Sequence, residues 1–228
     1  MQAVILAGGR GKRLRPMTDY MPKPLIPIKN IPIIQWQINY LKKHGIDNII
    51  ICTGYKTEQI EDFLKAKNHF GIKITISAEK TPLGTGGAIR KISKQIQDKT
   101  FFVINGDIIT NIDIKKMQKT INSIAAIPLK TKFGTLQLNN EKITGFSEKK
   151  EIQEIFMNAG IYYFSRNILK NLPKKGDIEK TLFPDYAKNN KLYNVRFTKS
   201  LWYSIDSFKD IEDCGSEINK IIHRDDEA

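Results

Sequence analysis

Cysteine and histidine are scarce in this sequence of 228 residues, which contains two cysteines and three histidines. Cys52, Cys214 and the histidines do not stand at the spacings of a zinc site, so a structural zinc site is excluded. No apolar run approaches the roughly 20 residues that a membrane-spanning helix needs. No repeat with a period of about 20 to 50 residues is visible either. These absences exclude a zinc-stabilised protein, a membrane-spanning protein and a solenoid.

Long blocks of one charge sign are also absent, although the chain is basic overall. Lysine and arginine number 37 against 24 acidic residues, a formal net charge of +13. A basic surface can attract nucleic acid, or it can steer a phosphorylated small molecule into a cleft. Because the lysines are spread along the whole chain, charge alone does not decide between the two. The apolar residues 3–7 are too few for the core of a signal peptide, so we expect a cytoplasmic protein without a membrane partner.

Hydrophobic residues make up 40% of the chain, which is enough for a single core. Strands are predicted at short apolar runs rich in β-branched residues, namely 4–6, 49–51, 72–76 and 101–104. Most of these runs are unbroken, as is typical of strands covered on both faces of a parallel sheet. A helix is predicted after Pro32, another behind an N-cap at Thr57 and a third over 114–121. Strands and helices therefore alternate, as in a Rossmann-like α/β fold with a mostly parallel mixed sheet flanked by helices.

The second half of the chain changes character. Short strands joined by turns are predicted at 124–129, 134–138, 142–146 and 160–164. A final helix is expected behind Ser207, because Ser207 and Asp210 form a capping-box pattern ahead of a helical apolar repeat. No flexible linker separates the halves. We predict one domain over 1–228, consisting of a first half at 1–122, a β-rich insertion within 123–206, and a C-terminal helix and tail at 207–228.

Glycines and cations crowd residues 6–16, directly after the first predicted strand. Gly8, Gly9 and Gly11 allow the backbone to wrap closely around a phosphate group. Cationic side chains in the same segment, including Arg13, supply charge-assisted hydrogen-bond donors. The spacing fits neither a Walker loop nor a dinucleotide-binding fingerprint. The segment predicts a phosphate-binding loop, and a glycine-rich turn with surface cations is the alternative.

Lys23 stands between two prolines in the segment 21–27. The two rings limit the backbone and present the amine with little conformational freedom. A lysine beside a phosphate loop can neutralise the charge that builds up in phosphoryl or nucleotidyl transfer. An ordinary proline-rich loop is the alternative.

Two further segments follow predicted strands. Residues 82–88 are mostly small and open a helix, so the backbone there can accommodate a flat ring or a sugar, and the helix N-terminus offers free N–H groups. Asp107 lies just past the strand at 101–104, at the carboxyl end where ligands bind in open α/β sheets, and a carboxylate there can hold Mg²⁺. The alternatives are a turn ahead of a helix and a capping aspartate.

Together and in this order, these segments resemble the sugar-1-phosphate nucleotidyltransferase family. Residues 7–16 and 22–27 match its opening pattern throughout, Ala-Gly-Gly-x-Gly-x-Arg-Leu-x-Pro followed by Pro-Lys-Pro-Leu-x-Pro. Residues 105–107 resemble its metal-binding Asn-Gly-Asp. Residues 146–149 resemble its Phe-x-Glu-Lys-Pro, with Lys150 in the place of the proline, and 157–161 resemble its Asn-Ala-Gly-Ile strand at the sugar site.

The resemblance implies an enzyme in which a sugar 1-phosphate oxygen attacks the α-phosphorus of a nucleoside triphosphate, giving an NDP-sugar and pyrophosphate. A phosphate monoester is already mostly dianionic at neutral pH, so no general base is needed. The implied catalytic residues are Arg13, Lys23 and Asp107. The implied nucleotide ligands, mostly in the first half, are Leu6, Ala7, Gly8, Gly9, Gly11, Arg13, Lys23, Glu79, Pro82, Gly84 and Thr85. The implied sugar-phosphate ligands, all within 123–206, are Gly145, Glu148, Lys149, Asn158 and Gly160.

One segment departs from the family pattern, and it concerns the metal. The family commonly has Trp-x-Asp-Ile-Gly-Thr, whose aspartate is the second ligand of Mg²⁺ beside Asp107. This chain has Ser204 in the place of that aspartate and Asp206 in the place of the glycine. Residues 204 and 206 of a strand point to the same side, so Asp206 is predicted to replace the missing ligand. The alternative is that Asp206 caps the last helix.

The segment 82–88 looks most like guanylyltransferases acting on mannose- or heptose-type 1-phosphates, which favours GTP. Uridylyl-, thymidylyl- and cytidylyltransferases on other sugar or alcohol phosphates stay open, as does a non-catalytic regulatory subunit. The retained Arg13, Lys23 and Asp107 favour an enzyme. A nucleic-acid partner is not expected, because cations gather at a phosphate loop rather than among aromatics. Whether the chain forms a homo-oligomer stays open.

Overall fold

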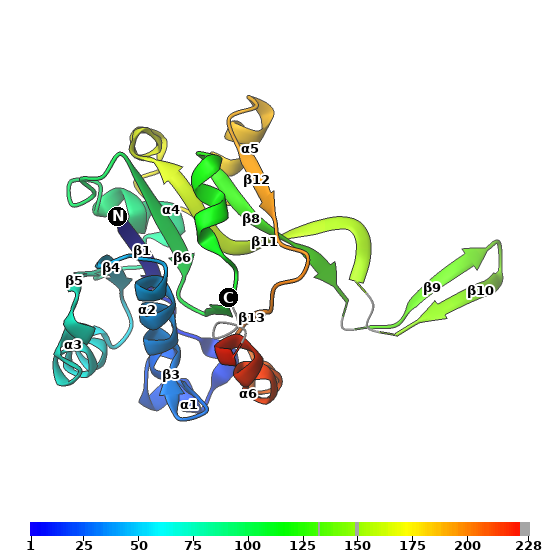
Figure 1. The fold of residues 1–228 in the computed structure, drawn as a ribbon, viewed down its shortest axis with the longest axis horizontal. Coiled ribbons are helices and arrows are strands. Elements are labelled where there is room, and N and C mark those ends of the chain that lie inside the picture. The colour runs from blue at the N-terminus through cyan, green and yellow to red at the C-terminus, as the bar shows by residue number, and fades with distance from the viewer. Residues whose placement is uncertain (132, 149–150, 224–228) are drawn as a thin grey trace.

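A seven-stranded mixed sheet forms the centre of the protein, with strand order β12-β8-β11-β6-β1-β4-β5 (Figure 1). The computed structural model describes residues 1–131, 133–148 and 151–223, apart from the side chains of 151–154 and 220–223. The strands of this sheet are β1 (Gln2–Ala7), β4 (Asn48–Thr53), β5 (Lys73–Ala78), β6 (Thr100–Asn105), β8 (Ser123–Lys130), β11 (Glu151–Ser165) and β12 (Tyr193–Arg196).

The pairing of these strands confirms the predicted fold class. β1 pairs in parallel with β4 and β6, and β4 pairs in parallel with β5. β11 pairs antiparallel with both β6 and β8, and β12 pairs in parallel with β8. The carboxyl ends of β1, β4 and β6 therefore meet at one edge, where ligands bind in open α/β sheets.

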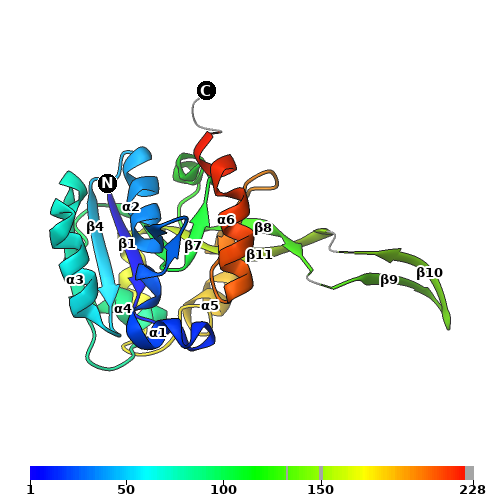
Figure 2. The same ribbon diagram turned by 90° about the horizontal axis from the view of Figure 1, so that it is seen from below.

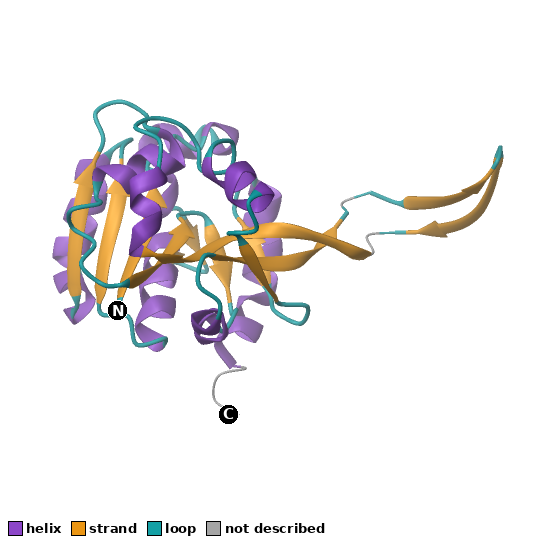
Figure 3. Ribbon diagram, turned by 90° about the horizontal axis from the view of Figure 1, so that it is seen from above, coloured by secondary structure: helices purple, strands orange, loops and turns teal. Residues whose placement is uncertain are grey.

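Helices cover both faces of the sheet (Figure 3), which explains why most of the predicted strands are unbroken apolar runs. Ile5 and Ile51 point into one core, whereas Val4 and Ile50 point into the other. The first core is covered by α2 (Ile33–Lys43), α3 (Thr57–Ala66) and the 3₁₀ helix η4 (Ile114–Lys119). The second is covered by α4 (Gly84–Lys91), η5 (Arg166–Asn171) and α5 (Leu182–Lys188).

A third, smaller core lies under the last helix, α6 (Phe208–His223), which packs beside the two-stranded ribbon of β7 (Ile108–Thr110) and β13 (Trp202–Ser204) (Figure 2). The predicted capping box is confirmed. The Asp210 N–H donates to the Ser207 hydroxyl at 3.3 Å, and the Ser207 N–H donates to the Asp210 carboxylate at 2.8 Å. Across the described ranges, no helix combines the length and the apolar composition that crossing a bilayer requires.

A separate hairpin of β9 (Thr135–Asn139) and β10 (Lys142–Ser147) projects from the body beyond the ends of β8 and β11 (Figures 1 and 3). We call residues 135–147 the arm. The strands predicted at 134–138 and 142–146 are confirmed, and the chain turns between them at Asn140, whose φ is 51°. The strand predicted at 160–164 is the last part of the 15-residue β11.

Two local predictions were wrong. Residues 114–119 form a 3₁₀ helix rather than an α-helix, because the three-residue spacing of Ile114 and Met117 fits three residues per turn as well. Thr57 is the first residue of α3 and not its N-cap, and its hydroxyl donates backwards to the Gly54 carbonyl at 3.1 Å. The remaining short elements surround the site or connect strands, and they are η1 (Lys12–Leu14), α1 (Met17–Tyr20), η2 (Lys23–Leu25), β2 (Pro27–Ile28), β3 (Ile31–Pro32) and η3 (Asn68–Gly71).

Candidate active site

A pocket of about 520 Å³ opens at the carboxyl ends of β1, β4 and β6. This volume lies in the usual range for small-molecule sites. Every residue predicted for catalysis, nucleotide or metal lines it: Leu6, Ala7, Gly8, Gly9, Gly11, Arg13, Lys23, Glu79, Pro82, Gly84, Thr85, Asp107 and Asp206. Segments from four distant parts of the chain, 6–23, 79–85, 107 and 206, thus converge on one cavity.

The glycine loop after β1 is shaped by close approach at two positions. A Cβ on Gly8 would lie 2.8 Å from a carboxylate oxygen of Glu79. Gly11 has a φ of +60°, and a Cβ there would lie 3.1 Å from the Cβ of Lys23. Gly9, in contrast, faces open space, with nothing within 4 Å of its Cβ position. Two of the glycines therefore let the loop contact Glu79 and Lys23, and the third leaves room for a ligand.

Lys23 joins the two predicted metal ligands. Its ammonium group donates to Asp107 Oδ2 at 2.7 Å and to Asp206 Oδ1 at 2.8 Å. The lysine side chain is only 11% exposed, whereas Arg13, whose guanidinium lies 2.8 Å from Asp206 Oδ1, is 75% exposed. Because buried charges are screened little, the Lys23 contacts dominate the electrostatics of the site.

Hydrogen bonds to the backbone hold Asp107 just beyond the carboxyl end of β6. The Gly106 N–H donates to the Leu6 carbonyl at 2.9 Å, so the turn lies against the end of β1. From α2, the side-chain amide of Gln37 donates to the carbonyls of Asn105 at 2.7 Å and Ile108 at 3.0 Å. These bonds hold the chain on both sides of Asp107.

Asp206 reaches the same place through the pairing of β13 with β7. Ser204 lies opposite Ile108, and the Ile205 N–H donates to the Asp107 carbonyl at 3.0 Å. The Ser204 hydroxyl donates to Asp206 Oδ2 at 3.2 Å, so the two side chains lie on one side as predicted. Since Ser207 and Asp210 cap α6, the Asp206 side chain is free for the pocket.

The charge environment keeps Asp206 ionised. Burial alone would raise the pKa of Asp206, but the hydrogen bond and charge of Lys23, the charge of Arg13 and the hydrogen bond from Ser204 outweigh it. The pKa of Asp206 is therefore held below its ordinary value.

Asp107 and Asp206 fit a hard divalent cation. The two carboxylates converge on the Lys23 ammonium, which lies within 2.8 Å of one oxygen of each, so a divalent cation held by both would replace that ammonium or use their other oxygens. Carboxylate oxygens supplemented by water and phosphate are typical of Mg²⁺ sites. The part of the chain that the structure describes holds no group of three or more such side chains, so the cation would take its other ligands from substrate and water.

The opposite end of the pocket is formed by Glu79 and the start of α4. One carboxylate oxygen of Glu79 accepts a hydrogen bond from the Leu83 N–H at 3.1 Å. The expectation that α4 offers free N–H groups to a ligand was wrong for three residues of its first turn, Thr85, Gly86 and Gly87. The N–H groups of Gly86 and Gly87 donate to the Gly176 carbonyl at 3.0 and 3.2 Å, because a loop from the second half lies on these glycines.

The predicted sugar-phosphate ligands are split between two places. Asn158 and Gly160 lie beside the pocket: the Gly160 N–H donates to the Asn158 side chain at 2.8 Å, and a Cβ on Gly160 would lie 2.8 Å from the pocket residue Asn105. Gly145 and Glu148 lie on the arm and at its base, and neither lines the pocket. Lys149 lies outside the described residues.

A hydrogen-bonded network connects the Asn158 side of the site to the start of α4. The Asn158 amide donates to the Tyr162 hydroxyl at 2.9 Å, which donates to Glu179 at 3.2 Å. Thr85 donates to the same carboxylate at 2.7 Å. Burial, followed by the charge of Glu179, raises the pKa of Tyr162, so the phenol stays protonated and acts as a fixed donor.

Sequence reasoning missed three residues at the site. Asp177 lines the pocket and accepts from the Thr85 N–H at 3.4 Å, and Cys52 lines it from β4. Gln37 supports Asp107 without lining the pocket. A signal for Gln37 was available, because this polar residue stands three positions after Ile34 and four before Leu41 on the apolar face of α2.

A Rossmann-like sheet with a glycine loop, a buried lysine and paired carboxylates at its carboxyl edge defines a nucleotide-binding enzyme of the transferase type. Residues 2–220 match the nucleotidyl transferase family, and the chain belongs to it. It is a sugar-1-phosphate nucleotidyltransferase.

Relatives of known activity and structure agree with this assignment. The chain is 36% identical over 203 residues to the D-glycero-alpha-D-manno-heptose 1-phosphate guanylyltransferase of Aneurinibacillus thermoaerophilus, covering 85% of this chain and 88% of that one. It is 36% identical over 196 residues to the enzyme of the same name from Campylobacter jejuni, covering 82% and 87%. The crystal structure of HddC from Yersinia pseudotuberculosis complexed with GMP-PN has a TM-score of 0.75 at 28% identity and covers 95% of this chain and 99% of that one.

Proposed function

We propose that the protein is a guanylyltransferase that condenses GTP with a manno-configured heptose 1-phosphate, releasing pyrophosphate and a GDP-heptose. The contact of Lys23 with both Asp107 and Asp206 carries the proposal, because it places one buried cation and two carboxylates where phosphates would meet. The activities named for the two heptose 1-phosphate guanylyltransferases supply the sugar.

In the proposed reaction, a phosphate oxygen of the sugar 1-phosphate displaces pyrophosphate from the α-phosphorus in line. The attacking phosphate is already an anion, so catalysis consists of alignment and charge neutralisation. The glycine loop and Arg13 bind the triphosphate, and Lys23 neutralises charge at the α-phosphate. Asp107 and Asp206 would hold Mg²⁺, which would supply further neutralisation of phosphate charge.

Glu79 supports guanine as the base. A carboxylate only accepts hydrogen bonds, and the Watson–Crick edge of guanine carries two adjacent donors, N1–H and the N2 amine. Uracil, thymine, adenine and cytosine each carry a single donor group on this edge, with one or two acceptors beside it. Glu79 lies in the pocket wall between Gly8 and Gly54, with one oxygen fixed by the Leu83 N–H. A carboxylate held there favours GTP over the other triphosphates.

For the sugar phosphate we propose Asn158 and Gly160 as ligands beside the pocket, whereas Gly145, Glu148 and Lys149, which the family resemblance implies, stay predictions. Asn158 and Gly160 lie close to Asn105, which lines the pocket. If the proposal holds, the substitution Asn158→Ala raises the KM for the sugar 1-phosphate and leaves the KM for GTP unchanged.

The test is pyrophosphate release across a panel of triphosphates and sugar 1-phosphates in the presence of Mg²⁺. GTP, UTP, dTTP, CTP and ATP are each combined with heptose, mannose, glucose, N-acetylhexosamine and muramate 1-phosphates. Turnover is expected with GTP, highest with the heptose phosphate and lower with mannose 1-phosphate. Preference for another base would refute the proposed assignment of Glu79. A folded protein that binds GTP but turns over no pair would instead be a regulatory subunit.

A further inference from the structure

The arm has one face made of large apolar side chains. Leu138 lies opposite Ile143, and Leu136 lies opposite Phe146. The register shifts between Ile143 and Gly145, so Phe146 rather than Gly145 shares the face of Ile143. Leu136, Leu138, Ile143 and Phe146 are 49%, 66%, 63% and 66% exposed. We call these four residues the apolar face of the arm.

The opposite face of the arm is polar, so the ribbon is amphipathic. It carries Gln137 and Lys142, and the Thr135 hydroxyl bonds across the ribbon to the Ser147 carbonyl at 3.2 Å. At the base of the arm, Phe133 and Ile155 add further apolar surface at 78% and 51% exposure. An apolar patch of this extent on a two-stranded ribbon indicates a surface that another molecule covers, because such a ribbon is at best marginally stable alone.

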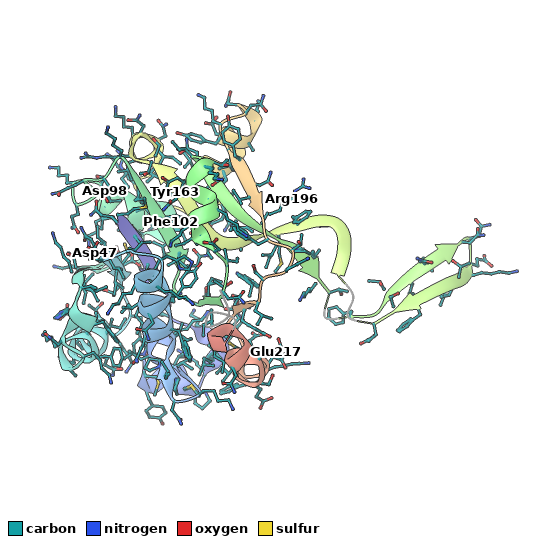
Figure 4. All side chains as sticks on the ribbon, in the orientation of Figure 1. Asp47, Asp98, Phe102, Tyr163, Arg196 and Glu217 are labelled. Atoms are coloured by element: carbon teal, nitrogen blue, oxygen red, sulfur yellow. The ribbon has the colours of Figure 1, made fainter. Side chains whose placement is uncertain are left out.

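The body of the same chain does not cover this face. β8 and β11 continue their ladder to the pair Lys130 and Glu151, which directs the arm away from the sheet. Arg196 on the neighbouring β12 lies over the ring of Phe156 at 4.8 Å and braces this ladder. Figure 4 shows the side chains of the arm projecting with no other element beside them.

We propose that a second copy of this chain covers the apolar face, with the two arms packed face to face about a two-fold axis. The exposed parts of the six apolar side chains amount to roughly 550 Å² per chain, when each whole side chain is counted at about 150 Å², the lower end of the range for aromatic residues. A stable interface needs about 800 Å² per partner, of which some 60% is apolar. The six side chains therefore supply the apolar share of one dimer.

The chemistry of the face also fits a second copy. None of its four side chains is charged, so two identical faces meet without repulsion although each chain carries a net charge of +13. Two stacked ribbons form a four-stranded, two-layer unit with a dry interior, which supplies the partner that each ribbon lacks.

Sedimentation velocity from 1 to 100 µM tests the proposal. The wild-type protein should sediment with twice the chain mass of 26.1 kDa. The double variant Leu138→Glu/Ile143→Glu should be a monomer that keeps the far-UV circular dichroism of the folded chain, whereas the control Gln137→Glu/Asn139→Glu on the polar face should stay a dimer. A monomeric wild-type protein would overturn the proposed dimer, and so would a variant Leu138→Glu/Ile143→Glu that is still dimeric.

Thiol cross-linking then tests the geometry. Leu138→Cys should give a covalent dimer with a bismaleimide that spans about 10 Å, the spacing of stacked ribbons. Asn139→Cys on the opposite face should not. Equal cross-linking at both positions would contradict face-to-face packing. Because neither experiment measures turnover, their outcome is independent of the proposed activity.

Discussion

The ammonium group of Lys23 lies 2.7 Å from Asp107 Oδ2, although the two residues are 84 positions apart. The same nitrogen contacts Asp206 at 2.8 Å, 183 positions from Lys23. One buried cation thus holds together the carboxylates that we assign to the metal. Without a divalent ion, Lys23 and the more exposed Arg13 offset the charge of the two carboxylates, and the arrangement predicts how the loss of the lysine changes the protein.

The substitution Lys23→Met should lower kcat at least about 100-fold, because the charge at the α-phosphate loses its buried counter-ion. In metal-free buffer it should also lower the free energy of unfolding by about 1–3 kcal/mol, since Asp107 then lacks the cation that contacts it and Asp206 keeps only the exposed Arg13. Mg²⁺ should raise the melting temperature of the variant more than that of the wild type. Pyrophosphate release and thermal denaturation with and without Mg²⁺ measure both effects.

The exposed Lys65 on α3 provides the control, and Lys65→Met should change neither quantity. Near-normal kcat in Lys23→Met would remove the lysine from the reaction. An equal response of both proteins to Mg²⁺ would show that the cation does not bind between these carboxylates.

Asp206→Asn should weaken Mn²⁺ binding, measured by the loss of the free-ion EPR signal, by about tenfold or more, because one of two carboxylate ligands becomes neutral. Ser204→Ala removes only the 3.2 Å hydrogen bond to Asp206 and should weaken binding far less. Ser204→Asp combined with Asp206→Asn should restore part of the affinity. Unchanged Mn²⁺ binding in Asp206→Asn would show that Asp206 is not a ligand.

The local parts of this site could be predicted because their residues are consecutive. The glycine loop and Lys23 come from two short segments, and Asp107 directly follows an apolar strand. The capping box of Ser207 and Asp210 is also a local sequence pattern. Because these two residues cap α6, Asp206 does not serve as the cap and its side chain lines the pocket.

Contacts between distant segments could not be predicted. Small residues at 84–87 suggested a helix end open to a ligand, whereas their glycines admit the backbone of Gly176, some 90 positions later. Asp177 enters the pocket with that loop. In the arm, the pattern of short strands joined by a turn was predicted correctly. The direction in which the arm projects depends on the ladder of β8 with β11, which the sequence does not show.

Glu79→Gln should change the choice of base. The amide offers a donor beside an acceptor, so it pairs with uracil or thymine and loses one contact to guanine. We expect kcat/KM for GTP to fall about 10- to 100-fold and that for UTP or dTTP to rise. Competition between GTP and UTP in one reaction, resolved by chromatography of the products, measures the ratio directly. An unchanged ratio would place the base elsewhere in the pocket.

Gly106→Ala should destabilise the fold and displace Asp107. A Cβ at this position would lie 2.5 Å from the Leu6 carbonyl oxygen, which is held in the central sheet and cannot move aside. We expect a loss of about 2–4 kcal/mol in urea unfolding. Gly9→Ala is the matched control, because nothing lies within 4 Å of its Cβ position. Equal stability of the two variants would contradict the close approach of this turn to β1.

Both native thiols should resist modification in the folded protein. Cys52 and Cys214 are 4% and 0% exposed. Burial first, and then the charges of Glu79 and Glu217, raise the pKa of Cys52 and of Cys214 to about 12. At pH 8 a disulfide reagent such as DTNB should therefore react with neither thiol until guanidinium unfolds the chain, when two per chain react.

The same shifts fix a sign for the pH dependence of stability. The unfolded chain releases these protons near pH 9 and the folded chain near pH 12, so both thiols lower the free energy of unfolding as the pH rises through that interval. In the double variant Cys52→Ala/Cys214→Ala, the free energy of unfolding should fall less steeply with pH. Chemical unfolding at several pH values between about 8.5 and 10 measures this slope. Rapid reaction of Cys52 at pH 8 would mean that the pocket opens in solution beside β4. Any background cross-linking in the arm variants would then come from Cys52.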